Sequence, residues 1–545
     1  MRESEPEASA LRAPPRATAM ELGWRFVARL RSLTLVDALC LVVAALAVVA
    51  LATAILHRYF DYDEMQHAYQ IELVRRGDRP FYDFFECHPP YAWYPLSLLA
   101  RAFGDSYKVL FALRLLSTAG HVVFLLYLGK NVALSLRSFR PAPSLAARWF
   151  VLGAVMVVVA PAVIDYVLEF RIDSWPNALL VFAIYRYRRK PGSSWRSSAV
   201  FAFLTVAAVL CSPKLVLFLA LFVAADLVGA SDRLTRIAGM AAGGIAALAL
   251  GALLLLLARL NPYHVYKLAI VYHAQLAAKG GWGRGLAREV FGRPVLLGIV
   301  GAGALAWFVS ARRRILQFPF ELAMVGFLAL QLGFVTFPYK QYYAPWFMLG
   351  AGLVPYLEIA LRRTRVLHSV ALAVAILYTA DNAWEGRQRY EAPAARSDIS
   401  YRQWMESVVP PTGFVMAPME TMPLYRRGPL YQLAGSFAPS GFDAERIARD
   451  LQLEPFSSRF TQAAFDRDME ANPPDLILVT GFYAPLQRTA IDHYFVHHRA
   501  EYDREQTQRG AVLVRKTNVQ AVTTASPAPQ PQQGAGTAAP AEKLP

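Results

Sequence analysis

Residues 38–67 read ALCLVVAALAVVALATAILHRYFDYDEMQH, and this stretch decides the class of the protein. Its first part, 38–56, is an apolar run about as long as a helix must be to cross a hydrocarbon core roughly 30 Å thick. Asp61, Asp63 and Glu64 follow immediately. The sequence therefore predicts a first membrane-spanning helix with an acidic segment just beyond its end.

The composition of the whole chain agrees with a membrane protein. Of its 545 residues, 55% are hydrophobic and 18% are charged, whereas soluble proteins carry about 25% charged residues. The formal net charge of +16 would suit a nucleic-acid partner. However, the arginines gather in short clusters between apolar runs, which is the pattern that sets membrane topology. We therefore expect the lipid bilayer, and no nucleic acid, as a partner.

Apolar runs recur along residues 33–383, which we expect to form a transmembrane domain. Every arginine-rich cluster between the runs falls on one side of the membrane, the cytoplasmic side. This topology predicts an all-α polytopic protein of the inner (plasma) membrane, with a cytoplasmic tail over 1–32 and outer loops over 58–107 and 259–293. About eleven helices are expected, at 38–56, 109–128, 149–168, a short run ending near 184, 200–210, a run ending at 228, 237–257, 294–309, 320–337, 344–360 and 366–380.

The region 384–518 differs in character from the apolar part. It mixes both charges and alternates short strand-like runs with helical patterns, which predicts a small α/β domain on the outer, periplasmic or extracytoplasmic side. The tail 519–545 is rich in proline, alanine, glutamine and threonine and should be disordered. The strand-like runs are 414–417, 476–480 and 511–514, and the helical patterns are 399–408, 444–451 and 460–469.

The outer loop 58–107 holds most of the residues that could carry out chemistry. Asp61 is placed to cap a helix, and the apolar spacing of 66–76 indicates a helix along the membrane surface. The following stretch, 79–90, reads RPFYDFFECHPP, and its aromatic residues and adjacent prolines should bury its carboxylates in part. Carboxylates held close together in such surroundings suit a general base, because the pKa of one of them rises.

These motifs resemble the GT-C superfamily, in the branch with bacterial relatives of protein O-mannosyltransferases and lipid A aminoarabinose transferases. The resemblance covers the membrane region and, more loosely, the region after it. It departs at Ile172, where proline is expected. The motifs that carry it are Asp63-Glu64, Gly77-x-x-Pro80-x-Tyr82-Asp83-Phe84-Phe85-Glu86-x-His88-Pro89-Pro90, Glu169-Phe170-Arg171-Ile172-Asp173, Ser212-Pro213-Lys214, Lys340-Gln341-Tyr342-Tyr343-Ala344-Pro345 and Leu424-Tyr425-Arg426-Arg427-Gly428-Pro429.

The resemblance implies a membrane glycosyltransferase that uses a polyprenyl-phosphate-linked sugar as donor and a glycan, lipid or protein as acceptor. Asp63 would take the proton from the acceptor hydroxyl, and Glu64 would orient the acceptor or share the charge. The attack would come from the face opposite the leaving phosphate, by analogy with inverting glycosidases. The donor phosphate is a good leaving group that needs no proton donor. Because such a donor carries no nucleotide diphosphate, the usual reason for a divalent ion is missing, and no cofactor is expected.

The donor phosphate needs positive charge, and Lys340, Arg171 and Lys214 lie at predicted outer helix ends. Each of these cations could equally make an ordinary headgroup contact. Lys340 is the strongest candidate because tyrosines surround it in the sequence. The remaining residues expected to bind substrate or phosphate are Asp173, Tyr343, His67, Tyr82, Asp83, Glu86 and His88.

Two alternatives remain open at the level of sequence. A divalent metal could be held by Glu86 and His88 together with His264 or His273, although no spacing here is diagnostic of zinc. The chain could also be a polytopic transporter or a flippase for lipid-linked sugars. Such a protein would be expected to carry repeated halves and charges in the middle of its helices, and the long apolar runs show almost none.

Overall fold

The computed structural model describes residues 34–84, 86, 88–139, 143–189, 194–271, 294–334, 348–362, 364–418, 421–428, 461–479, 483, 485–507 and 510–518. The expected tails, 1–32 and 519–545, and the helical pattern at 444–451 lie outside these residues.

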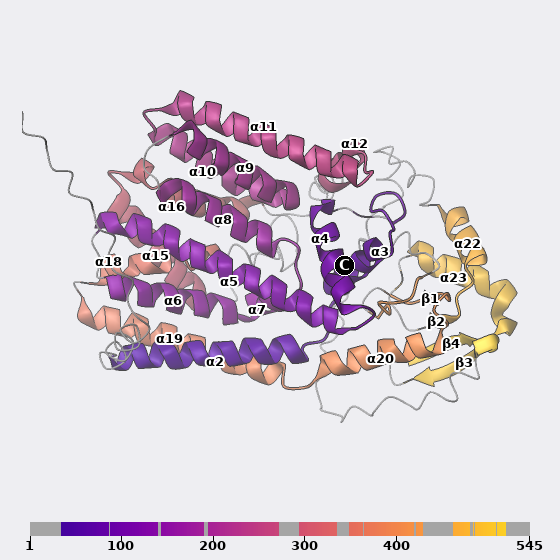
Figure 1. Ribbon diagram of the computed structural model, residues 1–545. Helices are drawn as coiled ribbons and strands as arrows, with labels where there is room; N and C mark the ends of the chain where they lie inside the picture. The colour runs from indigo at the N-terminus through magenta and orange to yellow at the C-terminus, as the bar shows by residue number, and fades with distance from the viewer. Residues whose placement is uncertain are drawn as a thin grey trace, which may run out of the picture.

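Long helices running side by side form the bulk of the protein (Figure 1). Five of those described are long and apolar enough to cross a membrane, and shorter apolar helices accompany them. The expected polytopic helical fold is therefore confirmed. The helices of the bundle are α2 (Leu35–His57), α5 (Lys108–Leu136), α6 (Pro143–Val159), α7 (Pro161–Leu168), α8 (Ser174–Arg189), α9 (Trp195–Cys211), α10 (Val216–Gly229), α11 (Arg233–Leu257), α15 (Pro294–Ala311), α16 (Pro319–Phe334), α18 (Leu357–Leu361) and α19 (Arg365–Arg389).

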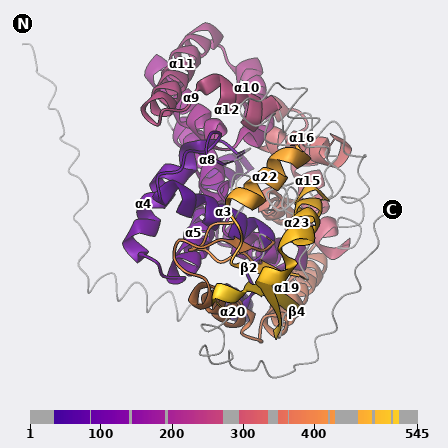
Figure 2. The same cartoon turned by 90° about the vertical axis from the view of Figure 1, so that its right-hand side faces the viewer.

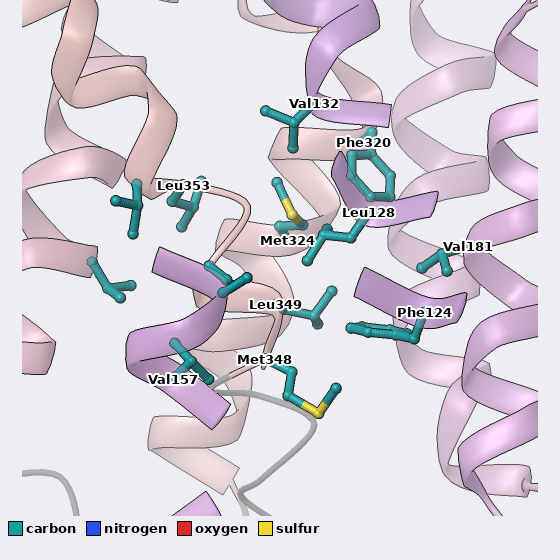
Figure 3. Close-up of a cluster of buried hydrophobic side chains, with 14 of the residues drawn as sticks. Phe124, Leu128, Val132, Val157, Val181, Phe320, Met324, Met348, Leu349 and Leu353 are labelled. Atoms are coloured by element: carbon teal, nitrogen blue, oxygen red, sulfur yellow. The ribbon is translucent and has the colours of Figure 1, made fainter. Parts of the chain in front are cut away.

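The core of the bundle is built from large aliphatic and aromatic side chains. Figure 3 shows Leu128 of α5 packed beside Met324 and Phe320 of α16. Elsewhere the packing depends on small residues: a Cβ atom on Gly243 of α11 would lie 1.9 Å from the carbonyl oxygen of Ala199 in α9. Small residues let two membrane helices approach this closely.

The third predicted helix is divided in two. The expected single span at 149–168 is α6 followed by α7, and Pro161 occupies the first turn of α7. Proline is well tolerated at that position. In the middle of a continuous helix it would disrupt the helix, because it lacks the N–H that the helix requires. Helix α7 then ends at Leu168, directly before Glu169.

Helices α3 (Tyr62–Arg75) and α4 (Trp93–Phe103) lie between the ends of the bundle helices and the C-terminal strands (Figure 1). Every residue of α3 from Glu64 to Val74 is buried. The helix that the sequence predicts over 66–76 is therefore confirmed as the greater part of α3, which the C-terminal region covers. A short helix, α12 (Pro262–Tyr266), follows α11 at the same end of the bundle.

The C-terminal region contains a four-stranded sheet in the order β1-β2-β4-β3. Strands β1 and β2 are parallel, and the other pairs are antiparallel. The sequence did not predict β3, an edge strand in which Tyr502 alone is buried, or α23. The elements are α20 (Ala394–Val408), β1 (Val415–Met416), α22 (Gln462–Ala471), β2 (Leu476–Leu478), α23 (Pro485–His498), β3 (Tyr502–Thr507) and β4 (Gly510–Arg515).

The C-terminal region and the loop 58–107 share one hydrophobic core. Met65 and Leu73 of α3 belong to the same buried cluster as Leu476 of β2 and Val514 of β4. Polar contacts reinforce this core, since the hydroxyl of Tyr107 donates to Glu406 at 2.7 Å. Figure 2 shows the strands and α22 in front of the bundle ends.

Candidate active site

Arg58 organises the carboxylates at this end of the bundle. It directly follows α2, and its side chain is only 3% exposed. Its guanidinium contacts four carboxylates at distances between 2.7 and 3.3 Å. An arginine has five N–H donors in a rigid plane, so it can hold several acceptors at once. The four carboxylates belong to Asp61, Glu64, Asp165 and Glu169.

Glu64 is locked in place by this arrangement. Arg114, which is fully buried, donates to both of its oxygens at 2.7 Å, and the backbone N–H of Phe170 donates to one of them at 2.9 Å. Arg114 also donates to the carbonyl oxygens of Ile55, Arg58 and Tyr59, so it ties the end of α2 to the start of α3. This geometry favours Glu64 as a buried anchor over a group that faces substrate.

Asp63, by contrast, reaches the surface of the site. Its side chain is 30% exposed, whereas that of Glu64 is 2% exposed. Arg171 donates to Asp63 at 2.5 Å and makes two bonds to Glu169, so one guanidinium bridges an exposed and a buried carboxylate. Asp61 caps α3, as expected, by accepting the backbone N–H of Glu64 at 2.8 Å.

The pKa values of Asp61 and Glu169 are shifted in opposite directions. Burial raises the pKa of Glu169 well above its ordinary value, although Arg171 and Arg58 act in the other direction. Burial also acts to raise the pKa of Asp61, but hydrogen bonding to Glu169 and the charge of Arg58 hold it far below the ordinary range. The pair therefore favours a state in which Glu169 holds a proton while Asp61 stays ionised.

Asp173 and Lys214 form a second ion pair close to Arg171. The ammonium of Lys214 donates to one oxygen of Asp173, and the hydroxyl of Tyr166 donates to the other at 3.1 Å. Burial opposes the ionised form of Asp173, but Lys214 and Arg171 more than compensate and hold its pKa below the ordinary range. The side chain of Lys214 remains 43% exposed.

An aromatic group flanks these ion pairs. The ring of His67 lies 5.2 Å from that of His88, 5.4 Å from that of Trp93 and 6.1 Å from that of Phe170, the residue that precedes Arg171. Burial and the nearby charges of His88 and Arg171 depress the pKa of His67, which favours its neutral form. His67 and His88 are therefore brought together, as the sequence predicts for one site.

Glu86 is fully buried and binds His88. One carboxylate oxygen lies 2.7 Å from the backbone nitrogen and 2.8 Å from Nδ1 of His88. A metal site would need at least one more ligand, and within the part of the chain that the structure describes no three such residues come together. His264 is described, but His273 lies outside the described residues. The metal alternative stays a prediction, because His273 belongs to it.

Tyr82 and Asp83 lie on a turn that packs against α12. Tyr82 accepts the backbone N–H of Asn261 at 3.2 Å, and its ring lies 5.7 Å from that of His264. Asp83 binds the backbone and the guanidinium of Arg79. Between them and Pro80, Phe81 adopts a left-handed conformation with φ of 68°. This is costly for a bulky residue and persists only where the surroundings impose it.

Two expected site residues, Lys340 and Tyr343, lie outside the described residues. Sequence reasoning missed Arg58, Arg114 and Asp165. Arg114 carried a usable signal, since it is an ionisable residue inside an apolar run, and such residues are expected to serve a purpose. Asp165 sits in an apolar stretch as well.

No family model and no curated protein matches the chain. Among solved structures it is similar to the crystal structure of ArnT from Cupriavidus metallidurans bound to undecaprenyl phosphate, with 14% identity and a TM-score of 0.54 over 90% of this chain and 99% of that chain. The apo state of the same protein matches with 14% identity and a TM-score of 0.51 over 94% and 100%. The chain therefore shares the polytopic membrane fold of these structures, and an all-α polytopic membrane fold is what the sequence predicts.

Proposed function

We propose that the chain is an integral membrane glycosyltransferase that moves a sugar from a polyprenyl-phosphate carrier to an acceptor hydroxyl at the outer face of the membrane. The observation that carries this proposal is the contrast between Asp63, which is 30% exposed, and the buried ion pairs that hold it in position. The likeness in fold to a protein solved with undecaprenyl phosphate supports a donor of that class.

Asp63 acts as the general base in this reaction. Its carboxylate accepts the proton of the acceptor hydroxyl while the hydroxyl oxygen forms a bond to the anomeric carbon of the sugar. The bond from that carbon to the phosphate oxygen breaks, and the phosphate leaves with the electron pair. Attack from the opposite face inverts the configuration of the anomeric carbon.

Arg171 and Lys214 supply positive charge for the phosphate. Both are already paired with carboxylates, Asp63 and Asp173, so the positive charge that they bring to the phosphate is partly compensated. Glu64 contributes by holding Arg58 and Arg114. The proposal therefore assigns catalysis to Asp63 and positioning to Glu64, which revises the paired role that the sequence suggests.

We further propose that 33–383 forms the transmembrane domain and 384–518 an outer domain, with the N-terminus in the cytoplasm. The arginine clusters between helices support this orientation. Arg313→Cys and Asp105→Cys would each be made in a background without native cysteines. In intact cells a membrane-impermeant reagent should label Asp105→Cys and leave Arg313→Cys unlabelled. Labelling at Arg313 alone would reverse the proposed orientation.

The function is tested by Asp63→Asn in the native host, with surface glycans and lipid-linked sugars compared against wild type and a deletion. Asp105→Asn is the matched control, because Asp105 is 71% exposed at the same end of the protein. We expect the deletion and Asp63→Asn to share a glycan defect and to accumulate the lipid-linked donor. A deletion that alters no glycan but stops the export of a solute would instead support the transporter alternative.

A further inference from the structure

The junction between α19 and α20 contacts one of the four carboxylates that Arg58 binds, which we call the acidic cluster. Tyr390, which directly follows α19, is 6% exposed and packs in a small buried cluster with Ile55 of α2 and with Ile164 and Leu168 of α7. Its hydroxyl donates a hydrogen bond to Asp165, which is 225 residues away in the sequence. The segment that leads into the C-terminal region thus touches a carboxylate of the cluster directly.

The contact continues from Asp165 to Asp63 through two arginines. The oxygen of Asp165 that accepts from Tyr390 also accepts from Nε of Arg58 at 3.3 Å. Arg58 donates to Glu169 at 2.7 Å, and Arg171 joins Glu169 to Asp63. Apart from the tyrosine hydroxyl at its start, every link in this chain is a hydrogen bond from an arginine guanidinium to a carboxyl group.

A second set of contacts fixes the same junction to the segment before α3. Nδ1 of His57 lies 3.2 Å from the carbonyl oxygens of both Tyr390 and Glu391. Since both partners are acceptors, Nδ1 carries the proton. The backbone N–H of Phe60 donates to Asp398 of α20 at 3.0 Å. The two residues that flank Arg58 and Tyr59 are therefore both tied to the start of the C-terminal region.

We propose that Tyr390 is a positioning residue for Asp63, which it acts on through Asp165 and Arg58. Removing its hydroxyl leaves Asp165 with Arg58 as a partner and draws Nε of Arg58 toward Asp165. Arg58 then holds Glu169 less well, and Arg171 loses its fixed position beside Asp63. This inference rests on the proposed function of Asp63 as the base, and it makes the docking of the C-terminal region a condition for a correctly aligned site.

The test compares Tyr390→Phe with Tyr425→Phe in the full-length protein in lipid nanodiscs. Tyr425 is a matched control because its hydroxyl is buried and meets no hydrogen-bonding partner within the described residues. Undecaprenyl-phosphate-linked sugar prepared from the native host serves as donor, with the acceptor fraction from the same host. We expect Tyr390→Phe to lower kcat by about 10-fold to 100-fold, because a small misplacement of a reacting group has an effect of this size.

A double-mutant cycle separates positioning from a merely structural role. If Tyr390 acts through Asp165, then Tyr390→Phe should lower kcat in the wild-type background but change it little in the Asp165→Asn background, because the hydroxyl then has no carboxylate to hold. The melting temperature should fall no further than in Tyr425→Phe. Multiplicative effects in the double variant, or a loss of kcat that only follows the loss of folded protein, would overturn the proposal.

A hydrogen-exchange measurement keeps the two proposals apart. If wild type transfers no sugar, the proposed function fails, whatever Tyr390 does. In that case faster amide exchange over 58–64 in Tyr390→Phe than in Tyr425→Phe would still support the positioning of the acidic segment by Tyr390. Equal exchange in the two variants would overturn it independently of any activity.

Discussion

One guanidinium nitrogen of Arg171 lies 2.5 Å from the carboxylate of Asp63, although 108 residues separate them in the chain. Arg171 follows α7, which ends at Leu168, and Asp63 lies in the first turn of α3. The pair joins two segments that the sequence presents as separate motifs. It also places the proposed base beside a cation that the donor phosphate could share.

Arg171→Lys should impair transfer, because a lysine ammonium is a single point charge and cannot reproduce the flat donor set that binds Asp63 and Glu169 together. We expect kcat/KM to fall by about 10-fold to 100-fold, the size typical of misaligned reacting groups. The matched control is Arg389→Lys, which alters an exposed pair with Glu385. A wild-type rate in Arg171→Lys would show that the bridge between the two carboxylates is not needed.

Asp63→Asn and Glu64→Gln should affect different properties of the protein. The first should lower activity, and the second should lower stability. Asp63→Asn should lower kcat by about 10²-fold to 10⁴-fold, which is the usual contribution of a general base, with an unchanged melting temperature. Glu64→Gln should destabilise the protein by roughly 3–5 kcal/mol, because Arg58 and Arg114 keep their buried charges without a full partner. Unfolding in detergent and transfer assays on both variants would check this, and a stable, inactive Glu64→Gln would contradict it.

Gly243→Ala should destabilise the contact between α9 and α11. The added Cβ atom would lie 1.9 Å from the carbonyl oxygen of Ala199, so the two helices would have to move apart. The neighbouring Gly244→Ala is the control, since its Cβ atom would lie 3.7 Å from Val206. We expect a lower melting temperature for Gly243→Ala, and no loss or a gain of up to about 1 kcal/mol for Gly244→Ala, because alanine favours helix over glycine. Equal melting temperatures would contradict this packing.

His498 should make the stability of the C-terminal region depend on pH. Its two ring nitrogens lie 2.6 Å from an oxygen of Glu501 and 3.0 Å from one of Glu470, its ring stacks on Tyr494, and Arg515 binds Glu501. Hydrogen bonding to Glu501 and the charge of Glu470 raise the pKa of His498 above its ordinary value of 6.5.

Because the pKa of His498 is higher in the folded state, its contribution is complete below about pH 6.5 and is lost as the pH rises through the folded value. The melting temperature of wild type should therefore exceed that of His498→Asn at pH 5.5 and approach it at pH 8.5. A difference that does not vary with pH would argue that His498 contributes by packing on Tyr494 alone.

Local signals predicted much of the fold. Hydropathy located a helix near each expected run, and the residue types around Pro161 explain why one run became two helices. The cap at Asp61 was predictable, because an N-cap depends on residues only three positions apart. The strand β3 was not, since an edge strand with Tyr502 as its one buried residue lacks the alternation that marks a half-buried strand.

The candidate site was predictable only in part. The sequence singled out Asp63, Arg171 and Asp173 but could not pair them, because their contacts depend on how α3, α7 and α8 pack. It treated Asp63 and Glu64 as equivalent neighbours. Their different burial follows from the helical turn, which directs Glu64 toward Arg114 and Asp63 toward the surface of the site.

The shared core of α3 and the C-terminal strands has a consequence for biosynthesis. Met65 is made 449 residues before Val514, which belongs to the same cluster. The part of the apolar face of α3 that the strands cover therefore stays open until β4 has been made, and contacts between such distant residues form slowly. A nascent or truncated chain without β4 would expose Met65 and Leu73 to chaperones and proteases, so the cell can discard incomplete copies before they hold an assembled site.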